Sequence, residues 1–447
     1  MSKLSTNRAR PLLRQLLPLL GVLLSGVGLA GPAQAAVSAE TSFVFNTFSF
    51  LVHGFLVLWM AAGFAMLESG LVRTKSVTTI LLKNITLFSI AGIAYYLVGY
   101  NLMHDGVDGG FMGSFAPWQA DDRAALTGDY SAGYSASSDL FFQMVFVATA
   151  ASIISGTLAE RIKLWPFFVF VFFLSALVYP IQGAWLWGGG WLVELGFADF
   201  AGSTLVHSVG GWAALTGAIF LGARRGKYTV DGKALRIPAS SLPLATLGTF
   251  ILWLGWLGFN GGSQLALGSA ADAIAISNIY VNTTMASAGG VVAAVVLTQV
   301  LNKRIELTIV LNGALGGLVS ITAGPNTPGV GEAILIGATG SVLVTLATPL
   351  LDRWKIDDVV GAIPVHLVAG IWGTLAVPLT NPEASFIVQL IGIGAIGLFV
   401  CAASALAWFL LQQTIGLRLT QAEEALGIDK VECGTLAYPE FRLSQPI

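Results

Sequence analysis

Long apolar segments separated by short polar loops make up most of this chain. Eleven of these segments are about 20 residues long, the length that an α-helix needs to cross the hydrocarbon core of a bilayer. They cover approximately 42–67, 78–101, 139–158, 164–182, 202–223, 241–262, 276–300, 305–323, 331–351, 359–379 and 386–412. The pattern predicts an all-α polytopic membrane protein with eleven transmembrane helices. It disfavours a β-barrel, whose strands are only about 10 residues long and alternate in polarity.

The N-terminus has the layout of a secretory signal peptide. Basic residues precede an apolar run over residues 16–29, and the small-residue sequence AQA follows and ends at Ala35. This order is typical of a signal peptide with its cleavage site, and an uncleaved first helix is the alternative. We predict a cleaved signal peptide over 1–35, a membrane domain over 36–412 and a cytoplasmic tail over 413–447.

Basic residues lie on alternate loops. The loops after the first, third, fifth, seventh and ninth spans carry Arg73, Lys75, Arg161, Lys163, Arg224, Arg225, Lys227, Lys303, Arg304, Arg353 and Lys355. The opposite loops contain Arg123 as their single basic residue. The positive-inside rule therefore predicts an N-terminus outside the cell and a C-terminus in the cytoplasm.

Composition supports the membrane assignment. The 447 residues are 55% hydrophobic and 10% charged, and the mean hydropathy is +0.78. A soluble domain carries about 25% charged residues, so lipid must cover much of this surface. We expect a multi-pass protein of the inner or plasma membrane. The formal net charge of −2 gives no reason to expect nucleic-acid binding.

A nine-residue pattern, Asp-x-x-Gly-x-x-x-Val-His, occurs twice, as DFAGSTLVH at Asp199–His207 and DVVGAIPVH at Asp358–His366. The predicted topology brings the first copy into the membrane from outside and the second from the cytoplasm, five spans apart. This predicts an inverted 5+5 repeat with one final helix added. Each histidine lies about 12 Å along a helix from its aspartate, so both imidazoles are expected near the middle of a core about 30 Å thick.

The pair His207 and His366 suggests proton chemistry. Two neutral imidazoles can share one N–H···N hydrogen bond and leave their other nitrogens facing a lumen. Such a pair can accept or donate a proton or bind a polar neutral solute, whereas two unrelated core histidines are the structural alternative. A metal site needs about three ligands, and no cysteine or third histidine accompanies the pair. We therefore predict no metal and no cofactor.

The two aspartates stand where helices begin, so N-capping explains both. We interpret Asp358 as a cap only. Asp199 lies beside an aromatic-rich outer loop and has a second interpretation, as a charge in the field of an incoming cation. Trp187 of that loop is suited to hold a small cation by cation–π contact, although interfacial tryptophan is also common as a membrane anchor.

The segment DFAGSTLVHSVGGWAALTGAIFLGAR, residues 199–224, resembles the signature of the ammonium transporter family within the Amt/Rh superfamily. The resemblance covers nearly the whole mature chain, in the order of the family. Further similar segments are AGFAMLESGLVRTKS, FFQMVF, GTLAERIK, WGGGW, GWLGFNGGS, LNGALGGLVSITAG, DDVVGAIPVH and GLRLTQAEEALGID. Two positions depart from the common family pattern, Leu367 after the second histidine and Cys433 in the tail.

The resemblance implies a transporter of ammonium and ammonia, with no enzymatic activity, that forms a homotrimer in the membrane lipid with a central hydrophobic pore in each subunit. It also implies a PII signalling protein as partner at the cytoplasmic face, with Cys433 placing doubt on that regulation. Methylammonium use is left open. The residues implied are Trp187, Phe146, Ser263 and Asp199 for ammonium recruitment, Phe146 and Phe259 for a gate, Trp256 for the pore lining, and His207 and His366 for the twin-histidine pair.

In the implied mechanism, ammonium loses its proton near Asp199 or the aromatic site and ammonia crosses the apolar lumen. The proton either travels separately through the histidine pair or is not transported, and the sequence does not choose between the two. Three other functions are compatible with parts of the pattern. They are a sodium-coupled transporter with 5+5 broken helices, an ammonium sensor, and an intramembrane enzyme, which would need a nucleophile or metal beside the histidines.

Overall fold

The computed structural model describes residues 37–442. The predicted signal peptide, residues 1–35, lies outside the described residues. Over 37–442 the chain consists of helices and loops, with two isolated β-bridges and no β-strand. The prediction of an all-α fold is therefore confirmed for the described part of the chain.

Residues 37–442 contain eleven apolar helical spans, as predicted, ten of them long and the eleventh, α13, only 15 residues. Several spans are composite, since a π-helical turn (η2 to η5) joins or begins their α-helical parts. The spans are α2 (Ala39–Leu71); α3 (Val77–Ala94), η2 (Tyr95–Gly99) and α4 (Tyr100–His104); α6 (Ala136–Thr157); α7 (Leu164–Phe173), η3 (Leu174–Val178) and α8 (Tyr179–Ala184); η4 (Ser203–Ser208) and α10 (Val209–Leu221); α11 (Leu242–Gly262); α12 (Ala270–Asn302); α13 (Leu307–Ile321); α14 (Val330–Arg353); η5 (Ile363–Val368) and α15 (Ala369–Thr380); and α16 (Phe386–Thr414).

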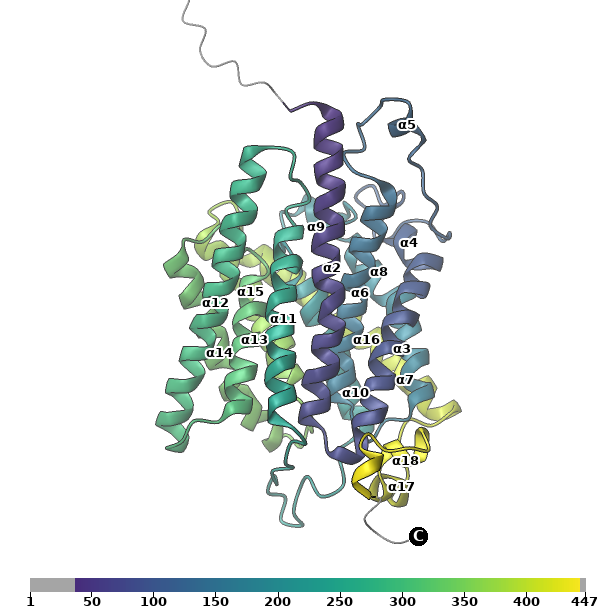
Figure 1. Cartoon of the computed structure of the whole chain (residues 1–447), viewed down its shortest axis with the longest axis vertical. Coiled ribbons are helices and arrows are strands. Elements are labelled where there is room, and N and C mark those ends of the chain that lie inside the picture. Colours follow the sequence, from purple (N-terminus) through teal and green to yellow (C-terminus); the bar gives the residue numbers. More distant parts are fainter. Residues whose placement is uncertain (1–36, 443–447) are drawn as a thin grey trace, which may run out of the picture. The chain divides into compact units, whose positions relative to one another are not determined.

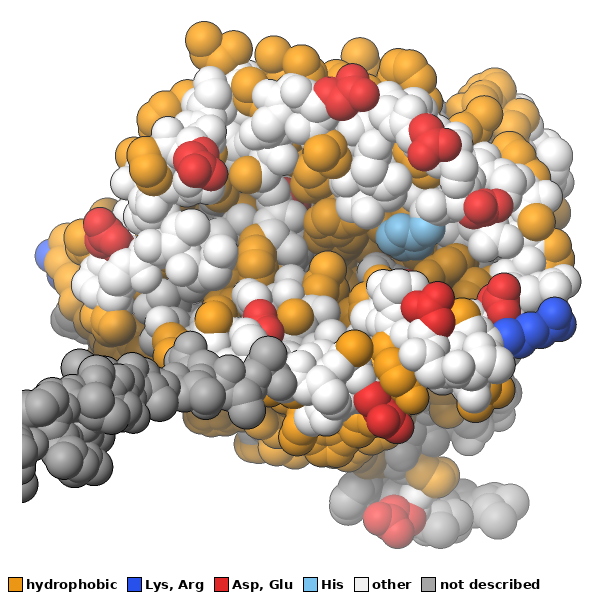
Figure 2. Space-filling model, turned by 90° about the horizontal axis from the view of Figure 1, so that it is seen from above, with side chains coloured by type: hydrophobic (Ala, Val, Ile, Leu, Met, Phe, Trp, Pro, Cys, Tyr) orange, Lys and Arg blue, Asp and Glu red, His pale blue; other side chains and the backbone are white. Residues whose placement is uncertain are grey.

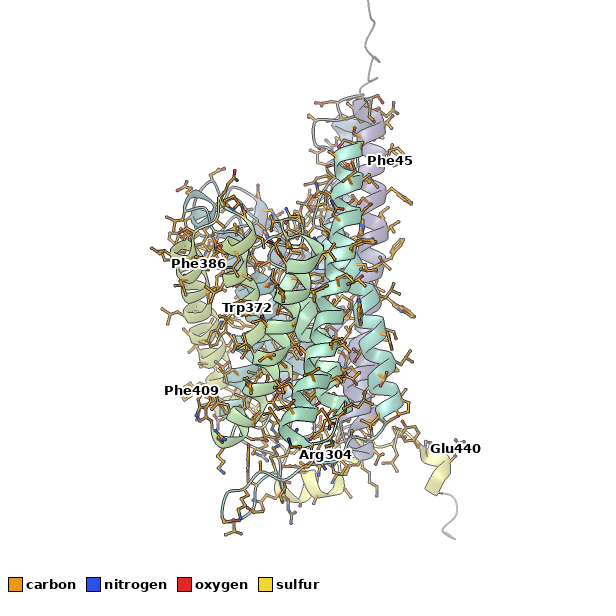
Figure 3. The ribbon with its side chains drawn as sticks, turned by 90° about the vertical axis from the view of Figure 1, so that its left-hand side faces the viewer. Phe45, Arg304, Trp372, Phe386, Phe409 and Glu440 are labelled. Carbon is orange, nitrogen blue, oxygen red and sulfur yellow. The ribbon has the colours of Figure 1, made fainter. Side chains whose placement is uncertain are left out.

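The spans of Ala39–Arg442 run side by side as a bundle (Figure 1). Short helices lie at its two ends: α5 (Arg123–Leu126) and α9 (Trp191–Glu194) toward the upper end, and α17 (Gln421–Leu426) and α18 (Ile428–Glu432) at the lower end. The lower end also carries the arginine- and lysine-rich loops that follow the first, third, fifth, seventh and ninth spans. We call this end of the bundle the basic face. Figure 3 labels Arg304 at this end.

The sides of the bundle are apolar. Figure 3 shows Phe45, Phe386 and Phe409 projecting away from the helices, and each side chain is about half exposed. Phe386 and Phe409 mark the two ends of α16, so an apolar surface extends along this helix. Large exposed apolar side chains over the whole height of a bundle are typical of a surface covered by lipid.

Small residues allow the helices to pack closely. At Gly248 of α11, an added Cβ would lie 2.3 Å from the backbone nitrogen of Leu67 in α2. Any larger side chain would therefore push α11 away from α2. Close approach of backbones at glycine is a common way to pack helices in membranes, where lipid supplies no hydrophobic drive between them.

Buried ion pairs hold the loops of the basic face together. Asp357 accepts hydrogen bonds from the Arg224 side chain at 2.8 and 2.9 Å, and its backbone carbonyl accepts one from Arg161 at 2.6 Å. Glu160 pairs with Arg73 at 2.5 Å and Arg224 at 3.5 Å. Burial alone raises the pKa of Asp357, but Arg224 outweighs burial and holds that pKa below its ordinary value.

The C-terminal tail is tied to the same face. Asp429 of α18 accepts hydrogen bonds from the backbone amides of Thr78 and Thr79 at 3.0 and 2.8 Å. The Lys75 ammonium donates to the carbonyls of Glu424 and Ala425 at 3.0 and 2.8 Å. The described part of the tail therefore packs on the start of α3.

Candidate functional site

The two copies of the nine-residue pattern fold in the same local way. In each copy, the aspartate side chain accepts backbone amides at the start of a π-helical turn that contains the histidine. The glycine of the pattern takes a positive φ in both, +105° at Gly202 and +79° at Gly361, a conformation that favours glycine. π-Helical turns are rare and often occur at functional sites. The pattern thus encodes an anchored irregular turn that presents an imidazole to the interior of the bundle.

The aspartates differ in how many donors they satisfy. Both oxygens of Asp199 accept backbone amides, those of Gly202 and Ser203 at 3.0 and 2.8 Å and those of Thr204 and Leu205 at 2.8 and 2.9 Å. The side chain is buried, and burial raises the pKa of Asp199 to about 6, against the opposing effect of the four amides. Recruitment of a cation by this carboxylate stays a prediction.

Asp358 accepts two backbone amides, from Gly361 at 3.1 Å and Ile363 at 2.7 Å, and the hydroxyl of Thr157 at 3.0 Å. These bonds agree with a structural role for Asp358 at the start of the span, where the N-cap of the turn itself is Ala362. Together, the three hydrogen bonds use both carboxylate oxygens of Asp358.

The histidines meet, although they are 159 residues apart in the sequence. Nδ1 of His366 lies 3.3 Å from Nδ1 of His207, within hydrogen-bond distance, and both rings are buried. Only one of the two nitrogens can carry the shared proton, so one imidazole donates and the other accepts. Nε2 of His207 has no hydrogen-bond partner among the described residues.

Aromatic rings continue the column above the histidines. The Phe146 and Phe259 rings stack with centroids 4.0 Å apart, and Phe259 lies 5.2 Å from His207. Trp256 stacks on His207 at 4.8 Å, and its indole N–H donates to the Thr322 hydroxyl at 2.7 Å. The predicted gate and pore-lining residues are thus assembled around the histidine pair.

A cavity of about 170 Å³ opens above Phe146. Of the four predicted recruitment residues, Trp187, Phe146 and Ser263 line it, and Asp199 does not. The Trp187 and Phe146 rings lie edge to face at 6.2 Å, and the Ser263 hydroxyl donates to the Phe259 carbonyl at 2.9 Å. Asp199 contributes through its backbone carbonyl, which accepts the Trp187 indole N–H at 3.0 Å. Asp199 and Trp187 both also line a neighbouring cavity.

Figure 2 shows the face of the molecule opposite the basic face. The face is hollowed near its middle, where a histidine and hydrophobic side chains lie. Acidic side chains are scattered around the hollow, and lysine and arginine are seen only at the edges. This distribution of charge favours the approach of a cation.

Sequence reasoning missed several residues of this cavity. Besides the predicted residues, the wall is formed by His104, Tyr134, Asp139, Phe142, Gln143, Phe200 and Leu265. Asp139 is buried and accepts a hydrogen bond from the Tyr100 hydroxyl. An acidic residue at the start of a predicted span was the available signal for Asp139, whereas nothing local indicated the other positions.

A second, much smaller cavity of about 10 Å³ lies on the other side of the histidine pair. His366 and Glu68 both line it, together with Phe64, Asn312 and Gly361. Glu68 stands just past the predicted end of the first span, and Lys83 inside the second. Two ionisable residues in apolar segments are the sequence signal for this second cavity.

The sequence matches the profile of the Ammonium Transporter Family over residues 48–438. It is 41% identical to ammonium transporter Amt2 of Archaeoglobus fulgidus over 428 residues, which cover 88% of this chain and 87% of that protein. It is also 41% identical to a putative ammonium transporter of Synechocystis over 431 residues, 95% of this chain and 96% of that protein.

Solved structures of similar fold agree with the sequence matches. A structure described as a sensor Amt protein is 35% identical, has a TM-score of 0.82 and covers 88% of this chain and 98% of that chain. The crystal structure of Mep2 from Candida albicans is 25% identical, with a TM-score of 0.76 and coverage of 87% and 89%. The chain therefore belongs to the ammonium transporter family.

Proposed function

We propose that this protein binds ammonium in the cavity of about 170 Å³, removes its proton there, and conducts ammonia past the stacked phenylalanines and the histidine pair. The observation that carries the proposal is the continuous column of rings from that cavity to the middle of the bundle. The column consists of Phe146, Phe259, His207 and His366, at successive centroid distances of 4.0, 5.2 and 5.2 Å.

The outer cavity suits a small cation. The rings of Trp187 and Phe146 can each stabilise a cation by about 0.5–2 kcal/mol, with the larger value where water is excluded. The Ser263 hydrogen is used by the Phe259 carbonyl, so the Ser263 oxygen is left to accept a hydrogen bond from ammonium. Asp199 acts in recruitment as the residue that holds the Trp187 indole in place.

The phenylalanine stack favours loss of the proton before passage. Rings with centroids 4.0 Å apart are in contact, so a hydrated ion cannot pass between them without their movement. A charge at the centre of a bilayer costs about 2.5–3.5 kcal/mol or more. Neutral ammonia avoids that cost, and the apolar lumen therefore selects it.

The histidine pair provides a route for the proton that ammonium leaves behind. A proton received at Nε2 of His207 can displace the shared proton toward Nδ1 of His366, which releases one in turn from its own Nε2. The contact of 3.3 Å between the two Nδ1 atoms supports this transfer. Transport is then charge-coupled, with ammonia and the proton following separate routes.

The remaining features of the proposal concern assembly and orientation. We propose a homotrimer in the inner or plasma membrane, with one pore per subunit, residues 1–35 as a signal peptide, and the basic face and tail in the cytoplasm. The alternation of basic loops supports the orientation, and the matching local fold of the two pattern copies supports an inverted 5+5 repeat. The tail and the basic face together form the surface proposed for a PII protein, and methylammonium is the second substrate to test.

The test is an ammonium concentration jump on proteoliposomes, with current and internal pH recorded in parallel. We expect a transient inward current in the wild type, with little rise of the internal pH because ammonia and the proton both reach the interior. His207→Ala is expected to abolish the current or alter ion selectivity. Absence of any flux in the wild type contradicts the proposal, and unchanged current and selectivity in His207→Ala removes the role of the pair.

A sensor is the second candidate, because the structural relative with a TM-score of 0.82 is described as a sensor Amt protein. A sensor binds ammonium in the outer cavity without conducting it. Ammonium binding to the purified protein without current or pH change in proteoliposomes would favour this function.

A further inference from the structure

Two oppositely charged side chains are buried among the spans near the basic face. Glu68 of α2 is 1% exposed and Lys83 of α3 is 2% exposed. Ionisable side chains inside a membrane protein are costly to bury, and they usually mark a pathway for ions or protons. The proposed transport pathway, as described above, uses neither residue.

Ser155 of α6 bridges the two residues. Its hydroxyl donates to Oε2 of Glu68 at 2.7 Å, and its backbone carbonyl accepts from the Lys83 ammonium at 2.6 Å. None of the ion pairs found among residues 37–442 joins Glu68 to Lys83 directly. The Lys83 ammonium also lies 4.9 Å from the centroid of the Phe167 ring. The Lys83 ammonium is therefore held near the Glu68 carboxylate, and neither oxygen of Glu68 is used in a direct ion pair with it.

The second oxygen of Glu68 is unused. Oε1 is buried and has no hydrogen-bond partner among the described residues. A buried acceptor without a partner costs about 1–3 kcal/mol, so a purely structural link between helices would be better served by a fully bonded carboxylate. An oxygen left free in this way is available to a water molecule or a proton.

The cavity beside Glu68 connects it to the histidine pair. Glu68 and His366 line the same space of about 10 Å³, which is close to the volume that one water molecule needs. Val360 and Gly361, which belong to the loop between α14 and η5, line the same space. One water there can bridge the imidazole and the carboxylate, but a hydrated ion cannot fit.

We infer that Glu68 is the inner proton acceptor of the pore, positioned by Ser155 and kept beside a positive charge by Lys83. His366 releases a proton from its ring nitrogen to the bridging water, and that water releases a proton to the Glu68 carboxylate, which becomes neutral. The carboxyl group then loses the proton to water at the basic face, where ammonia leaving the lumen takes it up. One ammonium ion is thus lost outside and one is formed inside, and Glu68 returns to its charged form.

This inference rests on the proposed charge-coupled transport, so the experiment measures current and ammonia flux separately in the same proteoliposomes. In Glu68→Gln we expect the ammonium-driven current to fall by about 100-fold, the usual size of a lost proton-transfer group. Ammonia conduction should persist because the lumen and gate are unchanged, and ammonia that enters without its proton should raise the internal pH more than in the coupled wild type. Glu68→Asp retains a carboxylate and should recover part of the current.

Glu440→Gln, the same chemical change on an exposed residue of the basic face, is the matched control and should not alter the current. If Glu68→Gln does not fold because it leaves Lys83 unpaired, the double variant Glu68→Gln/Lys83→Met removes both charges and is expected to show the same selective loss of current.

Three results overturn the inference. They are an unchanged current in Glu68→Gln, an equal loss of current and ammonia flux with no recovery in Glu68→Asp, and a wild type that conducts ammonia without current. In the third result ammonia conduction remains, so only the inference about Glu68 fails. A wild type that shows neither current nor ammonia flux refutes the proposed function itself.

Discussion

Replacing Asp199 by asparagine should loosen the outer end of the pore. Oδ1 of Asp199 accepts two backbone amides, and Oδ2 accepts two more. Asparagine offers one acceptor oxygen and an NH2 group that can only donate. In the variant two of the four amides lose their acceptor and face a donor, even though the side chain keeps its size. Asparagine therefore cannot separate capping from charge at this position.

The magnitude follows from the number of amides left without an acceptor. Each buried donor without a partner costs about 1–3 kcal/mol, so Asp199→Asn should cost about 2–6 kcal/mol. Asp358→Asn is the matched control in the second copy. If its oxygen keeps the bonds of Gly361 and Thr157, only the amide of Ile363 loses its acceptor, at about 1–3 kcal/mol.

Thermal unfolding in detergent, compared across the wild type and the two variants, measures this difference. We expect the midpoint to fall about twice as far in Asp199→Asn as in Asp358→Asn. Ammonium transport should also show a raised KM in Asp199→Asn, because the loop that holds Trp187 is anchored by this residue. Equal or smaller destabilisation in Asp199→Asn refutes the anchoring argument. A stable Asp199→Asn variant without transport would instead assign the carboxylate a direct effect on the ion.

Three further predictions concern the cavity, the gate and the basic face. Trp187→Leu should raise the KM for ammonium about fivefold without changing the maximal rate, because about 1 kcal/mol of cation–π stabilisation is lost; the concentration dependence of current measures this, and an unchanged KM contradicts it. Phe259→Ala should admit water and let potassium contribute to the current, and strict ammonium selectivity in this variant would show that the phenylalanine stack is not the barrier. Asp357→Ala should cost about 3 kcal/mol, the lower end of the range for breaking a buried pair, because Arg224 loses its closest carboxylate and keeps only the contact of 3.5 Å with Glu160. Since the folded pKa of Asp357 lies below its unfolded value of about 3.9, the wild-type advantage should be full above that pH and shrink as the pH falls toward the folded pKa; thermal unfolding at neutral and acidic pH tests this, and an advantage that grows on acidification contradicts it.

The number and order of the spans could be predicted because each must hide about 20 residues of apolar surface from water. Their ends could not. α2 continues to Leu71 rather than residue 67, and α12 begins at Ala270 rather than 276. Hydropathy marks the hydrocarbon core, whereas helices extend beyond it wherever their polar residues find partners. Glu68 fell outside the predicted first span for this reason, although the helix carries it into the bundle.

The repeated pattern predicted the meeting of His207 and His366, but not its form. Nothing in the spacing indicated π-helical turns or a contact between the two Nδ1 atoms. The pattern predicted that both aspartates cap the starts of helices, and the two oxygens of Asp199 do accept backbone amides. The number of amides that each carboxylate accepts depends on the geometry of the following turn, which a spacing of eight residues does not specify.

Sequence alone determined that this chain spans a membrane about eleven times, that two copies of one pattern bring imidazoles to its interior, and that it resembles ammonium transporters. Those features depend on hydrophobic length and on residue order, and both are local. Only the tertiary structure decided which side chains share a cavity. Asp139 and His104 join Trp187 on one side of the histidines, and Glu68 joins His366 on the other, because helices far apart in sequence pack against each other. Packing of several helices at once sets these neighbours, and no single segment carries that information.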